Sequence, residues 1–190
     1  LNKVSKASSR VLISGSSGSG KKTSARYIHE NSKQSTGNFI AVNCSVSDQD
    51  ELDRMLFGIE NKDGLQEVGA LEKANGGTIY LDEVAEIHLD LQGKLLKFLV
   101  EGTINRIGSN KQLDVDLRVI SSTNSDIPEK IKSKKFREDL FHRLNVVPIK
   151  IPSLNERIDD IPLLAKYFVE QLSSIDGFSY REFTNEALSF

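Results

Sequence analysis

The stretch that decides the fold of this chain is Val11-Leu12-Ile13-Ser14-Gly15-Ser16-Ser17-Gly18-Ser19-Gly20-Lys21. A short apolar run leads into a loop that fits the pattern G-x-x-x-x-G-K, and helical spacing follows. Backbone N–H groups of such a loop curl around phosphate oxygens, and the helix N-terminus adds positive dipole. We therefore expect Lys21 to reach the β- and γ-phosphates of a nucleotide. The residues expected to bind the nucleotide are Gly15, Ser16, Ser17, Gly18, Ser19, Gly20, Lys21, Lys22 and Thr23.

The position after this lysine departs from the usual pattern. It holds Lys22, where a serine or threonine would place a hydroxyl on Mg²⁺, and Thr23 stands one residue late. Metal binding should therefore rest on other residues. A glycine- and serine-rich loop that binds nothing is the competing interpretation, and the predicted strand and helix on either side of the loop count against it.

Bulk composition limits the classes of protein that fit. The chain has 190 residues, of which 38% are hydrophobic and 27% charged, which suits one domain, or one domain and part of a second. A net charge of −2 argues against electrostatic nucleic-acid binding by the chain as a whole. No apolar run could span a bilayer, and no secretory signal is recognisable, so we expect no membrane partner. The single cysteine, Cys44, suits the reducing cytoplasm and should be a buried structural residue.

Short apolar runs alternate with helical patterns along the chain. Strands are predicted at 11–13, 39–42, 78–81, 117–121 and 146–151, and a hairpin joins 103–107 to 113–115. Helices are predicted at 23–31, 49–57, 91–99, 136–144 and 159–172. This alternation predicts an α/β fold with a mostly parallel, five-stranded sheet flanked by helices. Ligands of such sheets bind beyond the carboxyl ends of the strands.

Polar residues gather at those strand ends. Asp82 can hold Mg²⁺, directly or through water, and Glu83 can orient or deprotonate an attacking water. Asn124 is expected to lie near the γ-phosphate, and Asn43 to hydrogen-bond Glu83. Taken one by one, an acidic pair before a helix or an asparagine in a turn is ordinary structure. Together with the loop at Gly15, however, these residues indicate a nucleotide site.

Two arginines are further candidates for the chemistry. Arg137 and Arg143 are of the residue type suited to neutralising a transferring phosphate, and such arginines can act in trans from a neighbouring subunit. The alternative for Arg137 is a surface ion pair with Glu138 or Asp139, which would be worth little. The basic run from Lys130 onward is interpreted as a solvated helix face rather than a DNA site.

Together these residues resemble the AAA+ central domain of the sigma-54-dependent transcriptional activators, over essentially the whole chain. The segment Gly69-Ala70-Leu71-Glu72-Lys73-Ala74-Asn75-Gly76-Gly77-Thr78-Ile79-Tyr80-Leu81-Asp82-Glu83-Val84 is similar to that family's Walker B signature. Other motifs stand in the family's order: Asn43-Cys44, Leu56-Phe57-Gly58, Arg118-Val119-Ile120, Phe136-Arg137-Glu138-Asp139-Leu140 and Arg143-Leu144-Asn145-Val146. The resemblance implies a P-loop core that binds ATP and Mg²⁺. It also implies that Arg137 and Arg143 are trans-acting fingers and that Asn43 and Glu83 form a glutamate switch.

The chain departs from that family in several places. Its members carry a loop with Gly-Ala-Phe-Thr-Gly-Ala that touches the sigma factor, whereas the equivalent stretch 59–68 is shorter and lacks this motif. Ser16 and Lys22 stand where the family usually has glutamates. The family's lid arginine would lie beyond Phe190. The missing loop makes the chain most similar to the NtrX-type response regulators.

This resemblance implies a domain plan and a set of partners. Residues 1–152 would form the AAA+ core, and residues 153–190 the start of a truncated helical lid. A receiver domain before the chain and a helix-turn-helix after it would lie outside this sequence. Through these two domains the protein would interact with its cognate sensor kinase, in a phosphorelay, and with promoter DNA. A second copy of the chain would bind at the nucleotide interface, in a dimer or a ring.

The sequence is compatible with three functions. The first is an ATP-binding regulatory domain of a two-component response regulator controlling transcription, with ATP hydrolysis between subunits as an open question. The second is a binding and oligomerisation module that takes ATP as a ligand and hydrolyses little or none, which Ser16, Lys22 and the missing loop motivate. The third is a sigma-54 activator ATPase with a divergent contact loop.

Overall fold

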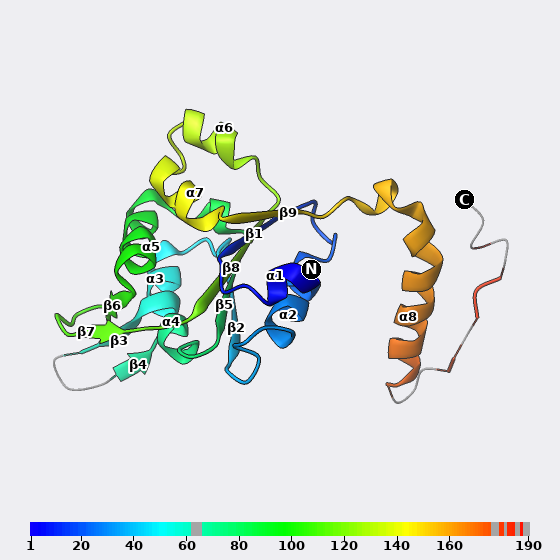
Figure 1. Cartoon of the computed structure of the whole chain (residues 1–190), viewed down its shortest axis with the longest axis horizontal. Coiled ribbons are helices and arrows are strands. Elements are labelled where there is room, and N and C mark those ends of the chain that lie inside the picture. Colours follow the sequence, from blue (N-terminus) through cyan, green and yellow to red (C-terminus); the bar gives the residue numbers. More distant parts are fainter. Residues whose placement is uncertain (62–65, 176–178, 181, 185–186, 188–190) are drawn as a thin grey trace. The chain divides into compact units, whose positions relative to one another are not determined.

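Figure 1 shows a computed structural model of the chain, which describes residues 1–61, 66–175, 179–180, 182–184 and 187. The chain divides into two units, Leu1–Ile151 and Pro152–Phe190, and each is described by itself. The first unit holds the parallel sheet and every residue that the sequence nominates for nucleotide chemistry.

A five-stranded sheet forms the centre of the first unit. Its strands are β1 (Val11–Ser14), β2 (Phe39–Asn43), β5 (Thr78–Asp82), β8 (Arg118–Thr123) and β9 (Val147–Lys150), in the spatial order β2-β5-β8-β1-β9. Every neighbouring pair in this order is parallel. A strand between two others in a covered sheet is buried on both faces, which explains the unbroken apolar run at the start of β1. The predicted α/β fold class with a five-stranded parallel sheet is confirmed.

Helices cover both faces of this sheet (Figure 1). One face carries α1 (Asn2–Ser5) and α2 (Lys21–Glu30), and the other carries α3 (Gln49–Phe57), α4 (Ala70–Lys73), α5 (Leu89–Glu101) and α7 (Glu138–Leu144). The short helix α6 (Ile127–Lys132) follows β8. The core is divided accordingly, because Ile13 packs with Ile28 on the α2 side while Leu12 packs with Leu95 on the α5 side. Successive side chains of β1 therefore point to opposite faces of the sheet, as expected of a pleated strand.

Several predicted helices begin two residues away from the expected position. The helix expected from Thr23 starts at Lys21, directly after Gly20, whose φ of 97° ends the loop. Four N–H groups at the start of a helix lack intrahelical partners, so this early start leaves amides of the loop available to a ligand. The helix expected from Phe136 starts instead at Glu138, because Phe136 is buried in the core and Arg137 is extended.

Two antiparallel hairpins lie at one edge of the first unit. The pair β6 (Thr103–Asn105) and β7 (Gln112–Asp114) is the predicted hairpin, with β6 shorter than expected and β7 displaced by one residue. The pair β3 (Gly58–Glu60) and β4 (Gln66–Val68) belongs to the stretch 59–68, of which residues 62–65 lie outside the described residues. Arg106 ties the hairpins together, since its guanidinium binds Glu72 at 2.8 and 3.0 Å and Glu60 at 3.5 Å.

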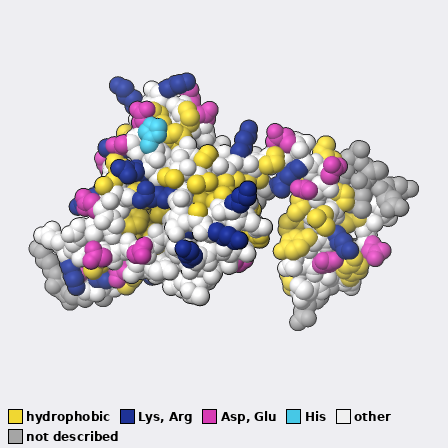
Figure 2. Space-filling model, viewed as in Figure 1, with side chains coloured by type: hydrophobic (Ala, Val, Ile, Leu, Met, Phe, Trp, Pro, Cys, Tyr) yellow, Lys and Arg dark blue, Asp and Glu magenta, His cyan; other side chains and the backbone are white. Residues whose placement is uncertain are grey.

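The second unit contains two short 3-10 turns, Leu154–Glu156 and Ile158–Asp160, and the helix α8 (Ile161–Ser173). Pro162 lies in the first turn of α8, as predicted, although the helix starts two residues later than the predicted position 159. Figure 2 shows hydrophobic side chains on the surface of this unit, and Leu163 and Phe168 of α8 are 72% and 58% exposed. None of the helices in the described part of the chain has the length and apolar character needed to cross a membrane.

Candidate functional site

The glycines of the loop from Gly15 to Lys22 leave room for a ligand. Gly18 and Gly20 have φ of +75° and +97°, in the left-handed region that favours glycine. A Cβ atom added at either glycine would meet nothing within 4 Å, so both border open space. At Gly15 an added Cβ would lie 2.8 Å from the carbonyl oxygen of Ile151. The loop is therefore packed against the chain at its first glycine and open at the two later ones.

Lys21 is the buried cation of this loop, with only 7% of its side chain exposed. Its Nζ donates to the carbonyl oxygens of Gly15 at 3.0 Å and Ser16 at 3.2 Å, and pairs with Oε1 of Glu83 at 3.2 Å. An ammonium has three protons, so these contacts use every donor. A phosphate oxygen that binds Lys21 must replace at least one of them.

Asp82 ends β5 with one carboxylate oxygen held by two hydroxyls. Its Oδ1 accepts from Ser122 at 2.5 Å and lies 2.9 Å from the hydroxyl of Tyr80. Burial raises the pKa of Tyr80, and the nearby Asp82 carboxylate adds to the rise, so this hydroxyl stays protonated. Within the described part of the chain no hydrogen bond reaches Oδ2 of Asp82, which leaves this oxygen for a metal ion.

Glu83 bridges the loop and the end of β8. Its φ of +55° lies in the left-handed region, which is costly for a residue with a Cβ and is found most often at functional sites. Oε1 faces Lys21, and Oε2 accepts from the backbone N–H of Asn124 at 2.8 Å. The carboxylate is thereby fixed between the loop from Gly15 to Lys22 and the loop after β8.

These groups line a pocket of about 260 Å³ at the carboxyl ends of the central strands. Its lining residues are Ser17, Gly18, Gly20, Lys21, Lys22, Thr23, Asp82 and Glu83. Of the other predicted loop residues, Gly15 and Ser16 hold Lys21 through their carbonyls, and Ser19 is buried beneath the loop. The pocket is smaller than the roughly 300 Å³ of a typical ligand site, so it suits the phosphate part of a nucleotide.

The predicted asparagines lie beside the pocket, but one predicted contact is not made. Asn43 was expected to hydrogen-bond Glu83, whereas its Oδ1 accepts from the backbone N–H of Ser45 at 3.0 Å and from the hydroxyl of Ser45 at 2.8 Å. This local turn satisfies the amide oxygen, and Glu83 finds Lys21 and Asn124 instead. The side chain of Asn124 is exposed, and its Oδ1 accepts from Ser125 at 3.3 Å.

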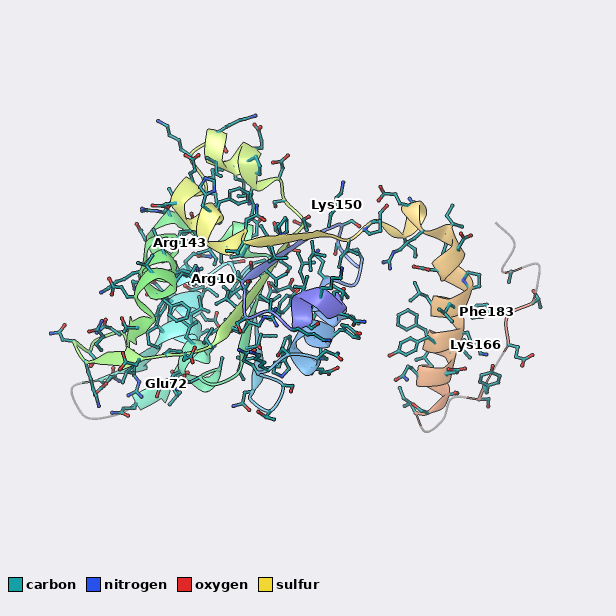
Figure 3. All side chains as sticks on the ribbon, in the orientation of Figure 1. Arg10, Glu72, Arg143, Lys150, Lys166 and Phe183 are labelled. Carbon is teal, nitrogen blue, oxygen red and sulfur yellow. The ribbon has the colours of Figure 1, made fainter. Side chains whose placement is uncertain are left out.

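The two candidate arginines do not line the pocket. Arg137 is exposed and forms a two-pronged ion pair with Asp139, at 3.0 and 2.8 Å, which lowers the pKa of Asp139. Figure 3 shows Arg10 beside Arg143, and the guanidinium of Arg10 donates to the carbonyl oxygens of Arg143 at 3.4 Å and Leu99 at 2.5 Å. The guanidinium of Arg143 has neither a hydrogen bond nor an ion pair with any described residue. Of the two arginines, only Arg143 has a guanidinium without a partner among the described residues.

Sequence reasoning missed two residues of the site. Tyr80 and Ser122 fix Asp82, and their hydroxyls lie 2.8 Å apart. A signal for Ser122 exists in the sequence, because Ser121-Ser122-Thr123 places three hydroxyls at the end of a strand that is buried throughout. Cys44 is buried, as expected, and burial together with Asp82 and Glu83 raises its pKa.

The donor set fits a nucleotide that brings its own Mg²⁺. Backbone amides, Lys21 and Lys22 suit phosphate oxygens, and Asp82 offers one carboxylate oxygen to a hard cation. Among the described residues no group of three or more His, Cys, Asp or Glu side chains could hold a metal ion by itself. Mg²⁺ commonly shares its coordination between one or two carboxylates, phosphates and water, which this arrangement permits.

Comparison with known proteins adds three findings. The Sigma-54 interaction domain family matches residues 1–150. The nitrogen assimilation regulatory protein NtrX of Azorhizobium caulinodans is 43% identical over 190 residues, covering 100% of this chain and 42% of that protein. The regulatory protein AtoC of Escherichia coli strain K12 is 45% identical over 176 residues, covering 90% of this chain and 38% of that protein.

Among solved structures, NtrX from Brucella abortus in complex with ATP matches with a TM-score of 0.91 at 41% identity, covering 98% of this chain and 43% of that chain. The chain thus spans less than half the length of each of these relatives. Another relative is the DNA-binding transcriptional regulator NtrC of Proteus hauseri, which is 38% identical over 192 residues.

Proposed function

The chain belongs to the Sigma-54 interaction domain family, and we propose that it is the ATP-binding AAA+ domain of a two-component response regulator that controls transcription. The relatives include response regulators, and one of them has been crystallised with ATP. Because the chain spans less than half of these relatives, the activity of the whole protein is part of the proposal. So are its cytoplasmic location, its sensor kinase and its promoter DNA.

The phosphate cradle is the observation that carries the proposal. Gly18 and Gly20 border open space, Lys21 lies buried with its ammonium at the loop, and Asp82 stands at the opposite wall. The loop amides and Lys21 would bind the β- and γ-phosphates, and Oδ2 of Asp82 would hold Mg²⁺. Bound Mg²⁺ would neutralise charge on the phosphates.

A nucleotide titration tests this function. Replacing Lys21 by alanine should weaken ATP binding roughly 10- to 100-fold, because a hydrogen bond from a charged group is worth about 1.5–3 kcal/mol. The matched control Lys111→Ala removes an exposed lysine that does not line the pocket and should leave affinity unchanged. Negligible binding by both the wild type and Lys21→Ala would refute the proposal.

Hydrolysis would need two copies of the chain. Glu83 would orient the attacking water and accept its proton, for which its carboxylate must leave Lys21. Arg143, and Arg137 after release from Asp139, would approach the γ-phosphate from the neighbouring subunit. Nucleotide would then lie between subunits of a dimer or ring.

A second function is favoured by specific contacts. Glu83 is fixed by Lys21 and Asn124, and Arg137 is neutralised by Asp139, so several reactive groups are already bound. Lys22 also stands at the position from which a hydroxyl would reach Mg²⁺. These contacts suit a module that binds ATP as a signal and hydrolyses little.

Phosphate release separates these two functions. The wild type and Glu83→Gln would be assayed at high protein concentration, so that intersubunit contacts form. Robust turnover that Glu83→Gln abolishes would exclude the passive module. Tight ATP binding without turnover in either protein would favour it.

A third function, sigma-54 activation, would require a contact surface in the stretch 59–68. The described part of that stretch is the hairpin β3–β4, which Arg106 ties to its neighbour through Glu60. Because the stretch 59–68 lacks the Gly-Ala-Phe-Thr-Gly-Ala motif, we propose that the chain works without contacting sigma-54. Capture of sigma-54 holoenzyme by the chain in ATP with a transition-state analogue would contradict this.

A further inference from the structure

One buried side chain, that of Gln92, joins three segments of the first unit. Gln92 lies near the start of α5 and is fully buried. Its Nε2 donates to the carbonyl oxygens of Ile87 at 2.7 Å and Lys135 at 3.1 Å, and its Oε1 accepts from the backbone N–H of Arg137 at 2.8 Å. Both amide protons and the amide oxygen are thus bonded. A reversed amide would set its oxygen against two carbonyl oxygens, so the orientation is fixed.

The first of these segments carries an acid of the candidate site. Ile87 stands four residues after Glu83, and the turn between them is buried at Val84 and Ala85. The backbone N–H of Glu86 donates to the carbonyl oxygen of Glu83 at 3.0 Å, which closes this turn. A displacement of Glu83 is therefore passed to Ile87 by a short, packed stretch of chain.

The other segments carry an arginine that the proposed function assigns to a neighbouring subunit. Lys135 and Arg137 flank Phe136, which is buried in the core, and Arg137 precedes α7. A second link runs parallel to that of Gln92, because Nζ of Lys130 donates to the carbonyl oxygen of Ala85 at 2.9 Å and to Glu86 at 2.7 Å. In Figure 1, α5 and α7 are neighbours on the same face of the sheet.

The chemistry of position 92 argues for a purpose beyond packing. An apolar side chain would fill this buried position without the cost of desolvating an amide. The amide instead makes three hydrogen bonds to two segments outside its own helix. One bond goes to the segment that follows Glu83, and two go to the segment around Arg137. Buried and fully bonded polar groups of this kind restrict a structure to one arrangement.

We propose that Gln92 is a positioning residue that couples the segment of Glu83 to the placement of Arg137, and so connects the nucleotide pocket of one subunit to the arginine it presents to the next. The inference rests on the proposed function. The driving event would be phosphate binding, because a phosphate that binds Lys21 competes with Glu83 for the ammonium. Release of Glu83 shifts the segment up to Ile87, and Gln92 transmits that shift to Lys135 and Arg137.

Hydrogen exchange of the whole chain tests this coupling without relying on hydrolysis. Exchange would be measured with and without Mg²⁺ and the ATP analogue that has an imido group between its β- and γ-phosphorus atoms. Peptides covering 15–22 report nucleotide binding, and peptides covering 134–138 report the coupling. In the wild type the analogue should slow exchange in the first and change it in the second.

Three variants separate coupling from packing. Gln92→Met removes all three bonds, so the Arg137 amide should exchange about tenfold faster and no longer respond to the analogue. Gln92→Glu keeps the acceptor for Arg137 and loses the donors, so basal protection should remain while the response is lost. The control Gln112→Met removes an amide that binds Thr103 in the β6–β7 hairpin and touches neither segment, and should behave as the wild type.

The outcomes distinguish the inference from the function on which it rests. A response at 134–138 that persists in both Gln92 variants would overturn the inference, as would a wild type protected at 15–22 and unchanged at 134–138. Absence of protection at 15–22 would refute nucleotide binding, and the inference with it. Thermal unfolding of each variant identifies a misfolded protein, and if Gln92→Glu fails to fold, Gln92→Met carries the test.

Discussion

At the scale of single residues, the site is organised by the competition for Lys21. The ammonium binds two loop carbonyls and Glu83, so the carboxylate that would activate water is also the group that occupies the phosphate-binding lysine. Phosphate binding and release of Glu83 are therefore one exchange of partners. Under the proposed function, Glu83 would oppose nucleotide binding in two ways, by holding Lys21 and by repelling the phosphates.

The first prediction follows from this competition. Glu83→Gln should bind the non-hydrolysed ATP analogue about fivefold more tightly than the wild type, because removing one partly buried charge interaction is worth on the order of 1 kcal/mol. Titration of both proteins checks it, with Glu129→Gln as a control on a distant, exposed glutamate. Equal or weaker binding by Glu83→Gln would show that Glu83 does not restrain Lys21.

The second prediction concerns His29, which is buried between α2 and β5 with Nδ1 2.9 Å from the hydroxyl of Thr78. Burial lowers the pKa of His29 in the folded chain below its ordinary value of about 6.5. Below about pH 6.5, His29 is therefore protonated in the unfolded chain but still neutral in the folded chain. The free energy of unfolding consequently falls as the pH drops below about 6.5. Between pH 7.5 and 5.5 the fall in Tm should be roughly 2 °C larger for the wild type than for His29→Gln. Equal falls in the Tm of the two proteins would contradict this prediction.

At the scale of elements, periodicity and glycine spacing predicted the sheet, the hairpin and the loop. The predictions that fail concern side chains whose hydrogen-bond partners are set by tertiary contacts. Asn43 bonds Ser45 rather than Glu83, since a turn two residues away satisfies its oxygen. Gln92 gave no signal, because a glutamine among leucines of a helix is ordinary until its partners 43 and 45 residues away are known. Residues that act through distant backbone groups leave no local pattern.

The third prediction belongs to α3, whose start is fixed by Asp48. The carboxylate accepts from the backbone N–H groups of Asp50 at 2.9 Å and Glu51 at 3.2 Å. Asp48→Ala should cost about 1 kcal/mol, or roughly 2–4 °C in Tm. Asp50→Ala removes a carboxylate from the same turn without removing this cap and should cost less. Thermal unfolding compares the two, and an equal loss would count against the capping role.

At the scale of the whole molecule, the fourth prediction concerns the two units. The sheet, the cores on its two faces and the pocket residues all belong to Leu1–Ile151. We therefore expect residues 1–151 expressed alone to unfold cooperatively, with a Tm within about 3 °C of the full chain. Differential scanning calorimetry measures this. A broad transition would indicate that the first unit depends on the second.

The buried position of Cys44 has a practical consequence for labelling chemistry. Cys44 is the single cysteine of the chain, it is fully buried, and its raised pKa keeps it as the unreactive thiol. We expect native protein to resist maleimides and to become labelled only on unfolding. A reporter attached through Ser153→Cys would then sit two residues past Ile151, whose carbonyl oxygen packs against Gly15. The folded chain thus accepts a single dye at position 153 without first being stripped of competing thiols.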